Sequence, residues 1–326
     1  MTRVEQVKRF IQQWGDAGHR WMVVPVVVAA LLTTVVLVKS CQGIVYMTSP
    51  EYKIHRLGYT TAEARLLLTV LSQAQADSLI ARGEHDTAAI PLVKERYFIA
   101  GNFDRYLAYH KQDTTGAPMS DIIAVVNVGR DLDPQQHARP CDTTRGYLML
   151  VNRLNYLDEH YTPRGLVTIS REYTYEENRA DSAAVKAFVA MQQECKRQTG
   201  AQLMVNSAYR SYQQQIATFK RNDKRYVAHA GRSEHQTSLA LDITSRQHPM
   251  RWPFDTSVEG VWMREHCHEY GFILRYPKKQ SHILGYSYEP WHLRYVGVET
   301  ATRVHDEGIT YDEYYAYYLG EIRDKR

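Results

Sequence analysis

The sequence has few cysteines and no strong bias of charge. Its four cysteines, Cys41, Cys141, Cys195 and Cys267, lie far apart and form no Cys-x-x-Cys pair, so a thiolate zinc site is not expected. The formal net charge of +4 over 326 residues is too small and too dispersed to indicate a nucleic-acid partner. An extracytoplasmic chain could still form a disulfide, but the spacing does not show which cysteines would pair.

Long apolar runs are also scarce, and one stands out near the N-terminus. Residues 21–38 contain no charged side chain, and about 20 such residues are typical of a membrane span. Basic residues within residues 1–20 favour a cytoplasmic N-terminus, so we predict a transmembrane anchor at 21–38 with the rest of the chain outside. A cleaved signal peptide is the main competing interpretation. Lipid modification of Cys41 is another.

The densest group of chemically useful residues lies in Ser233–Asp242 and in the later segment Glu289-Pro290-Trp291-His292. Two imidazoles and two carboxylates are what a mononuclear zinc hydrolase needs: three ligands, and a carboxylate that takes the proton of a water molecule. We predict one zinc ion held by His235, Asp242 and His292, with Glu289 as the general base. A single His or Asp in such a setting is usually structural, and the hypothesis depends on the combination.

Residue periodicity predicts the elements that carry these groups. Apolar residues alternate with polar ones around Asp242, which indicates a strand. A helix is expected from 181 to 199, followed by a strand that leads to Arg210 and by a helix at 212–221. Further strands are expected at Ile122–Val128, Tyr147–Val151, Phe272–Tyr276 and His292–Val296, and a Tyr-rich helix at Tyr311–Leu319. Residues 51–110 look helical, with capping boxes that begin at Thr60 and Ser72.

These motifs resemble the VanY-like D-alanyl-D-alanine carboxypeptidases, a zinc metallopeptidase group that includes LD-carboxypeptidases and VanX-type dipeptidases. The resemblance covers about the C-terminal half of the chain. It rests on Ser-x-His-x6-Asp, on Glu-Pro-Trp-His, on Ser207-Ala-Tyr-Arg-Ser and on Gly271-Phe-Ile-Leu-Arg-Tyr. It implies an α+β domain at residues 120–326: a mainly antiparallel sheet with flanking helices and one zinc site, similar to the Hedgehog and DD-peptidase fold. It also implies substrate contacts by Arg210, Gln215, Ser233 and Tyr276.

The implied activity is removal of the C-terminal D-Ala from peptidoglycan stem peptides. Arg210 would bind the substrate carboxylate as a bidentate cation and thereby assist catalysis by Glu289. Residues 51–110 would form a spacer or a wall-facing region, and the enzyme would act outside the bacterial cell membrane. Two alternatives stay open: an LD-carboxypeptidase acting on tetrapeptide stems, and a non-catalytic, zinc-stabilised wall-binding module. Stereochemical specificity and oligomeric state are not set by the sequence.

One position departs from the family pattern. Relatives usually carry Gly three residues after the first His, where this chain has Ser238. If the backbone there needs a positive φ, Ser costs on the order of 1 kcal/mol without removing a ligand. The triplet His266-Cys267-His268 fits no HExxH arrangement, and we expect it to be structural.

Overall fold

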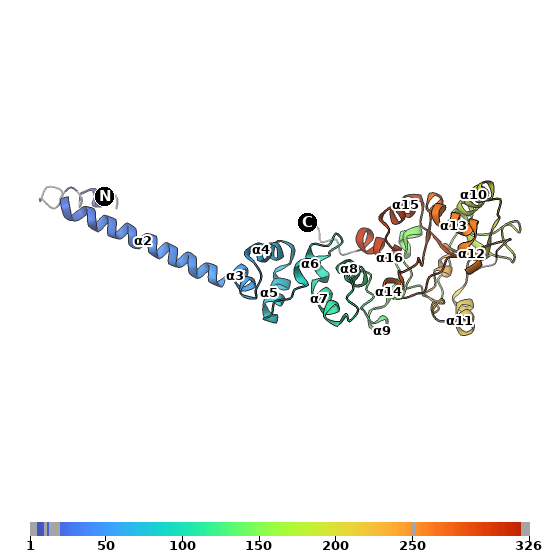
Figure 1. Cartoon of the computed structure of the whole chain (residues 1–326), viewed down its shortest axis with the longest axis horizontal. Coiled ribbons are helices and arrows are strands. Elements are labelled where there is room, and N and C mark those ends of the chain that lie inside the picture. Colours follow the sequence, from blue (N-terminus) through green and yellow to red (C-terminus); the bar gives the residue numbers. More distant parts are fainter. Residues whose placement is uncertain (1–4, 10–11, 13–19, 249–251, 321–326) are drawn as a thin grey trace. The chain divides into compact units, whose positions relative to one another are not determined.

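The computed structural model describes residues 5–9, 12, 20–248 and 252–320 (Figure 1). The chain divides into two compact units, Met1–Val93 and Lys94–Arg326. The metal-ligand candidates and the pocket around them all lie within the second unit, so each unit can be described by itself.

A long apolar helix dominates the first unit. Helix α2 runs over Arg20–Thr48, and its stretch Val27–Thr48 is long and apolar enough to cross a membrane (Figure 1). A signal sequence near an N-terminus has the same properties. Most of the predicted cytoplasmic segment 1–20 lies outside the described residues, as do the side chains of Trp21 and Cys41.

Four short helices follow α2 in the first unit. Both predicted capping boxes are confirmed: Thr60 caps the helix that begins at Thr61, and Ser72 caps the one that begins at Gln73. Buried Ile54, Leu67 and Leu79 lie between these helices, so tertiary packing stabilises segments too short to be helical alone. The helices are α3 (Pro50–Arg56), α4 (Thr61–Val70), α5 (Gln73–Arg82) and α6 (Ala89–Val93).

Two predicted strands of the second unit are wrong. The run Ile122–Val128 lies largely in helix α8, Met119–Asn127, which begins after Pro118 and is buried from Ile122 to Val126. A short apolar run has the same appearance in a buried strand and in a buried helix, and packing decides between them here. The predicted strand at Tyr147–Val151 overlaps the end of a 3₁₀ segment, Thr143–Leu148, which contains Gly146 at φ +56.

The centre of the second unit is a four-stranded sheet. Its strands are β5 (Leu203–Ser207), β6 (Ala240–Ser245), β7 (Phe272–Leu274) and β8 (His292–Tyr295), in the order β5-β6-β8-β7. Every neighbouring pair is antiparallel, as predicted. The mixed helix-and-sheet class expected from the sequence is therefore present.

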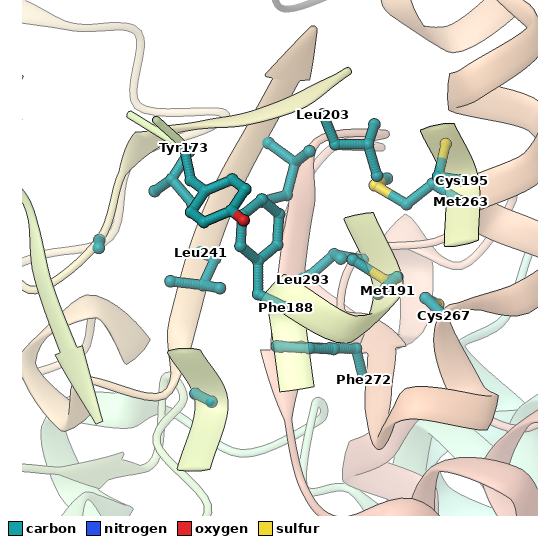
Figure 2. Packing of buried hydrophobic residues seen from close by; sticks show 14 of the residues in the cluster. Tyr173, Phe188, Met191, Cys195, Leu203, Leu241, Met263, Cys267, Phe272 and Leu293 are labelled. Atoms are coloured by element: carbon teal, nitrogen blue, oxygen red, sulfur yellow. The ribbon is translucent and has the colours of Figure 1, made fainter. Parts of the chain in front are cut away.

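Helix α10, Ser182–Thr199, packs its apolar side against this sheet. Asp181 caps its first turn and Gly200 ends it in the left-handed region, so the helix expected from 181 to 199 is present. In Figure 2, Phe188 and Met191 lie in the same cluster of side chains as Leu241 and Leu293 of the two central strands. This apolar core holds the strands that carry Asp242 and His292.

The remaining elements of the second unit are short. Those before the sheet are η1 (Ala100–Asn102), α7 (Phe103–Gln112), α9 (Pro134–His137), β1 (Arg139–Pro140), β2 (Asn155–Tyr156), β3 (Leu166–Thr168) and β4 (Arg179–Asp181). Those within or after it are α11 (Tyr212–Arg221), η3 (Glu234–Thr237), α12 (Trp252–Thr256), α13 (Val258–His266), η4 (Cys267–Tyr270), α14 (Ser281–Leu284), α15 (Val298–Glu307), α16 (Tyr311–Tyr314) and η5 (Tyr315–Leu319).

Ser238 does occupy a left-handed turn. Its φ is +66°, and it ends the 3₁₀ turn η3, Glu234–Thr237, which carries His235. Its side chain is buried, and its hydroxyl makes no hydrogen bond to any part of the chain that the structure describes. The strain expected from the missing glycine is therefore present beside the first ligand candidate.

We expect Ser238→Gly to raise the free energy of unfolding by roughly 0.5–1 kcal/mol, because it relieves the left-handed strain at the cost of some chain entropy. Chemical denaturation of the metal-free protein would measure this change. Ser207→Gly is the matched control: Ser207 lies in β5 outside the left-handed region, so that variant should lose stability. A loss in Ser238→Gly as large as in the control would contradict the strain argument.

Candidate metal centre

Three side chains converge as a potential metal-binding group. One ligand atom each from His235, Asp242 and His292 lies within 4.8 Å of the other two, and all three residues are buried. His235 Nε2 is 3.2 Å from Asp242 Oδ2, and His292 Nδ1 is 3.1 Å from Asp242 Oδ1. The carboxylate therefore lies between the two imidazoles.

Sheet register places two of these residues. Asp242 of β6 and His292 of β8 are direct partners across the antiparallel pair, so their side chains lie side by side on one face of the sheet. About fifty residues separate Asp242 from His292 in the sequence, and the pairing of β6 with β8 brings the two side chains together.

The orientation of His235 depends on β5. The register of β5 against β6 shifts between Val205 and Ser207, and the chain then presents the carbonyl of Ala208 to His235 Nδ1 at 2.6 Å. A hydrogen bond from Nδ1–H to that carbonyl leaves Nε2 unprotonated and directed at Asp242. An imidazole held in this way is ready to bind a metal through Nε2.

The donor set fits zinc. Two imidazole nitrogens and one carboxylate are the ligands of many catalytic zinc sites, which keep a further position open. Burial favours the neutral acid at Asp242, but His235 and His292 outweigh it and hold the pKa of that carboxyl well below its usual range. Asp242 Oδ1 is buried and accepts no hydrogen bond from the described residues, so a cation between the ligands would satisfy it.

Glu289 lies next to this group without belonging to its tightest set. Its backbone N–H donates to the Tyr276 carbonyl at 3.0 Å, and its Oε2 is 3.6 Å from His292 Nδ1. Burial raises the pKa of Glu289 to about 8, while His292 opposes the rise. A metal cation nearby would lower this pKa, because an opposite charge favours the ionised carboxylate. The group can then exchange a proton near neutral pH.

All eight residues singled out from the sequence line one pocket of about 410 Å³. Arg210 follows β5, Gln215 lies on α11, and Ser233 precedes η3. Tyr276 follows β7, and its ring centroid is 5.1 Å from that of His292. The other four are His235, Asp242, Glu289 and His292.

Arg210 is a cation of this pocket that lies close to the ligand candidates. Its backbone N–H donates to the His235 carbonyl at 3.2 Å, which ties it to the ligand turn. Burial lowers the pKa of its guanidinium, and the nearby Asp242 and Glu289 oppose that shift. Among the described residues, no carboxylate forms an ion pair with Arg210. The guanidinium is therefore free to bind an anion that enters the pocket.

Two further pocket residues, Gln215 and Tyr276, differ in which hydrogen-bond donors their side chains can offer to a ligand. Gln215 donates from Nε2 to the Ala228 carbonyl at 2.7 Å, so its side chain also holds the segment that follows α11. One N–H of Gln215 is then left for a ligand. Burial raises the pKa of Tyr276 well above its usual range, which keeps its phenol protonated and able to donate.

The sequence analysis missed the buried carboxylate of Glu234. Its Oε2 is 3.6 Å from His292 Nε2, on the ring edge opposite to Asp242. Its Oε1 accepts from Arg275 Nε and from Arg294 Nη1, each at 2.8 Å, and all three side chains are almost fully buried. Arg275 also pairs with Asp312 at 2.6 Å. The only feature of the sequence that pointed to Glu234 was its position next to His235 in the Ser-x-His motif.

The charges around Glu234 compensate one another. Burial favours the neutral acid, but Arg275 and Arg294 outweigh it and hold the pKa of Glu234 well below its usual range. Arg294 also donates to the carbonyls of Tyr147 and Met149, which fixes its position. This network supports the far side of the His292 ring.

The other histidine and cysteine candidates do not join the centre. His266 contacts Glu269, and His268 stacks on His305 with ring centroids 3.7 Å apart. In the described part of the chain, the potential metal ligands converge only at His235, Asp242 and His292. Cys141, Cys195 and Cys267 are free thiols, whereas the side chain of Cys41 lies outside the described residues.

Comparison with known proteins identifies the family of the chain. The VanY family, described as D-alanyl-D-alanine carboxypeptidase, matches residues 177–298. YodJ of Bacillus subtilis (strain 168) is 38% identical over 182 residues, which span 52% of this chain and 66% of YodJ. The structure of the LD-carboxypeptidase LdcB is 36% identical, with a TM-score of 0.52, and the match covers 55% of this chain and 90% of LdcB.

A vancomycin-resistance D,D-pentapeptidase VanY in complex with Zn(II) is 30% identical, with a TM-score of 0.43, and the match covers 52% of this chain and 98% of that one. The 36% identity to LdcB, over 90% of that protein, establishes the family relationship. The chain belongs to the VanY family of carboxypeptidases.

Replacing Glu234 by Gln should lower the free energy of unfolding by about 3 kcal/mol or more, because Arg275 and Arg294 would stay buried without their shared anion. Urea denaturation of the metal-free protein would measure the loss. Glu194→Gln is the control, since Glu194 forms an exposed pair with Arg197 and should have little effect. A change no larger than that of the control would show that the buried network contributes no stability.

Proposed function

We propose that this chain is a zinc-dependent D-alanyl-D-alanine carboxypeptidase that removes the C-terminal D-Ala from peptidoglycan stem peptides. One observation carries the proposal: the unpaired Arg210 lines the same pocket as the three ligand candidates and Glu289. A carboxypeptidase must hold a terminal carboxylate at a fixed distance from the bond it cleaves. A buried guanidinium beside a metal centre suits that task.

The pocket residues have separate roles in this reaction. Arg210 binds the substrate carboxylate in a bidentate manner, with an N–H of Gln215 and the Ser233 hydroxyl as further donors. A bound zinc ion supplies Lewis acidity toward the scissile carbonyl and toward water. Glu289 takes the proton of the attacking water and returns it to the leaving amine. Tyr276 lines the pocket and can donate to the oxyanion that develops on the carbonyl oxygen.

The zinc assignment rests on His235, Asp242 and His292, with one ion per chain. The family resemblance supports the same ligand set and the Hedgehog and DD-peptidase type of fold. We also propose that residues 1–20 are cytoplasmic, that residues 21–38 anchor the chain, and that residues 51–110 act as a spacer. The catalytic domain at 120–326 would then act on the wall outside the cell membrane.

The likeness to LdcB favours a second candidate, an LD-carboxypeptidase acting on tetrapeptide stems. Both reactions use the same centre, so only the substrate distinguishes them. Mass spectrometry of defined stem peptides incubated with the full chain in detergent would decide. Loss of D-Ala from pentapeptides supports the DD activity, and loss from tetrapeptides alone supports the LD activity. If the protein binds zinc but cleaves neither kind of peptide, the remaining interpretation is a non-catalytic wall-binding module.

Glu289→Gln should keep zinc while it lowers turnover by at least about a hundredfold, the lower range for general acid–base catalysis. His235→Ala and Asp242→Ala should lose zinc as well as activity, since each removes one of three protein ligands. Metal content and turnover would be measured on the same preparations. Near-normal turnover of Glu289→Gln would rule out its role as the base. If Glu289→Gln loses zinc while Asp242→Ala keeps it, Glu289 is the metal ligand and Asp242 is the base.

Arg210→Lys should raise KM for the peptide by about tenfold or more while zinc stays bound, because Lys keeps the charge but loses the bidentate fork. Steady-state kinetics and metal analysis would test this together. Arg221→Lys on the exposed end of α11 provides the control and should leave KM unchanged. Loss of zinc from Arg210→Lys would instead assign Arg210 a structural role at the His235 turn.

A further inference from the structure

Three arginines from separate segments gather beside Gly285 and Tyr286. Arg130 follows α8, Arg153 lies after the 3₁₀ segment η2 (Thr143–Leu148), and Arg232 precedes η3. A Cβ atom placed on Gly285 would lie 3.0 Å from Arg153 Cδ and 3.2 Å from Arg130 Nε. Burial, then the charge of Arg130, lowers the pKa of Arg153, and Arg232 contributes to the same shift.

Within the described part of the chain, these guanidinium groups have no counterion. None of the three forms an ion pair or a side-chain hydrogen bond with any residue that the structure describes, and Arg130 Nε is buried without a partner. Asp133 lies near enough to influence Arg153, but its carboxylate accepts from the Gln135 N–H at 2.8 Å as the cap of α9. Like charges held together in half-buried positions cost free energy, and an anion among them would offset that cost.

The cluster adjoins the catalytic pocket. Tyr286 lines that pocket, and the charges of Arg153 and Arg232 both act on its phenol. Arg232 directly precedes Ser233, another lining residue. The four chain segments that meet here thus place unpaired positive charge at the Tyr286 wall, in addition to Arg210 inside.

We propose that Arg130, Arg153 and Arg232 form a second anion subsite, which binds a carboxylate of the substrate peptide upstream of the scissile bond. The proposal rests on the peptidase function proposed above and narrows it to acidic peptides. Arg210 accounts for the terminal carboxylate, so this cluster requires another one. Stem peptides supply two sources: the free α-carboxyl of a γ-linked glutamate, and the side-chain carboxyl of a diaminopimelate residue.

The test compares three pentapeptides that end in D-Ala-D-Ala. One carries both internal carboxylates, one has the glutamate α-carboxyl as its carboxamide, and one has lysine in place of diaminopimelate. We expect loss of one of these carboxylates to weaken binding and to lower kcat/KM by at least about tenfold, the effect of a charge-assisted hydrogen bond. Which peptide is affected identifies the source of the carboxylate.

The discrimination ratio is kcat/KM for the peptide with both carboxylates divided by kcat/KM for the affected peptide. Arg153→Gln and Arg232→Gln should bring this ratio toward one. Arg171→Gln is matched in charge and lies at an exposed position between β3 and β4, so it should keep the wild-type ratio. Thermal melting of the free variants adds a second measurement. Removal of an uncompensated charge should not lower Tm, whereas removal of an arginine with a structural role would.

Isothermal titration calorimetry with the same peptides decides the subsite in the Glu289→Gln background, where zinc should stay bound and turnover should be lost. Equal affinity of that variant for all three peptides would overturn the proposal. So would a ratio that persists in both arginine variants, or a Tm that falls in both. If no peptide is hydrolysed but the acidic one binds more tightly, the peptidase function fails and the anion subsite stands.

Discussion

The antiparallel pairing of β6 with β8 is the constraint on which the metal centre depends. Its register puts Asp242 directly opposite His292, so a shift by one residue would turn one of the two ligands to the other face. The apolar core under the strands, with Leu241 and Leu293 fully buried, opposes such a shift. His235 is then added by a short turn whose conformation depends on β5. The chemistry of the centre thus follows from the packing of a small sheet.

This arrangement places several charged groups in the buried interior, and the two sides of His292 differ in how these charges are paired. Behind His292, Glu234 is matched by Arg275 and Arg294, and Arg275 by Asp312. In front of it, the carboxylates of Asp242 and Glu289 pair only with histidines among the described residues. Pairing with arginine on one side, and its absence from the other, distinguish the supporting network from the reacting face.

The sequence predicted what depends on local pattern. The capping boxes at Thr60 and Ser72 are confirmed because a side chain and a backbone N–H three residues away determine them. The run Ile122–Val128 was misread because burial on all sides removes the periodicity that separates helix from strand. The candidate ligands were found through the spacing of their motifs. Glu234 was missed because its partners Arg275 and Arg294 lie far away in the sequence, and the arginine cluster beside Tyr286 was missed for the same reason.

Unpaired positive charge is what the pocket offers to a substrate. Arg210 lies beside the candidate ligands, while Arg153 and Arg232 act on the Tyr286 wall, so there are guanidinium groups both inside the pocket and at one side of it. Between them stands a group of carboxylates that a metal cation would neutralise. A ligand with one anionic end would satisfy Arg210 alone, whereas a ligand with two separated anionic groups would satisfy both regions. Discrimination then arises from the cost of leaving arginines uncompensated in partly buried positions, since that cost is removed only by a substrate with both charges.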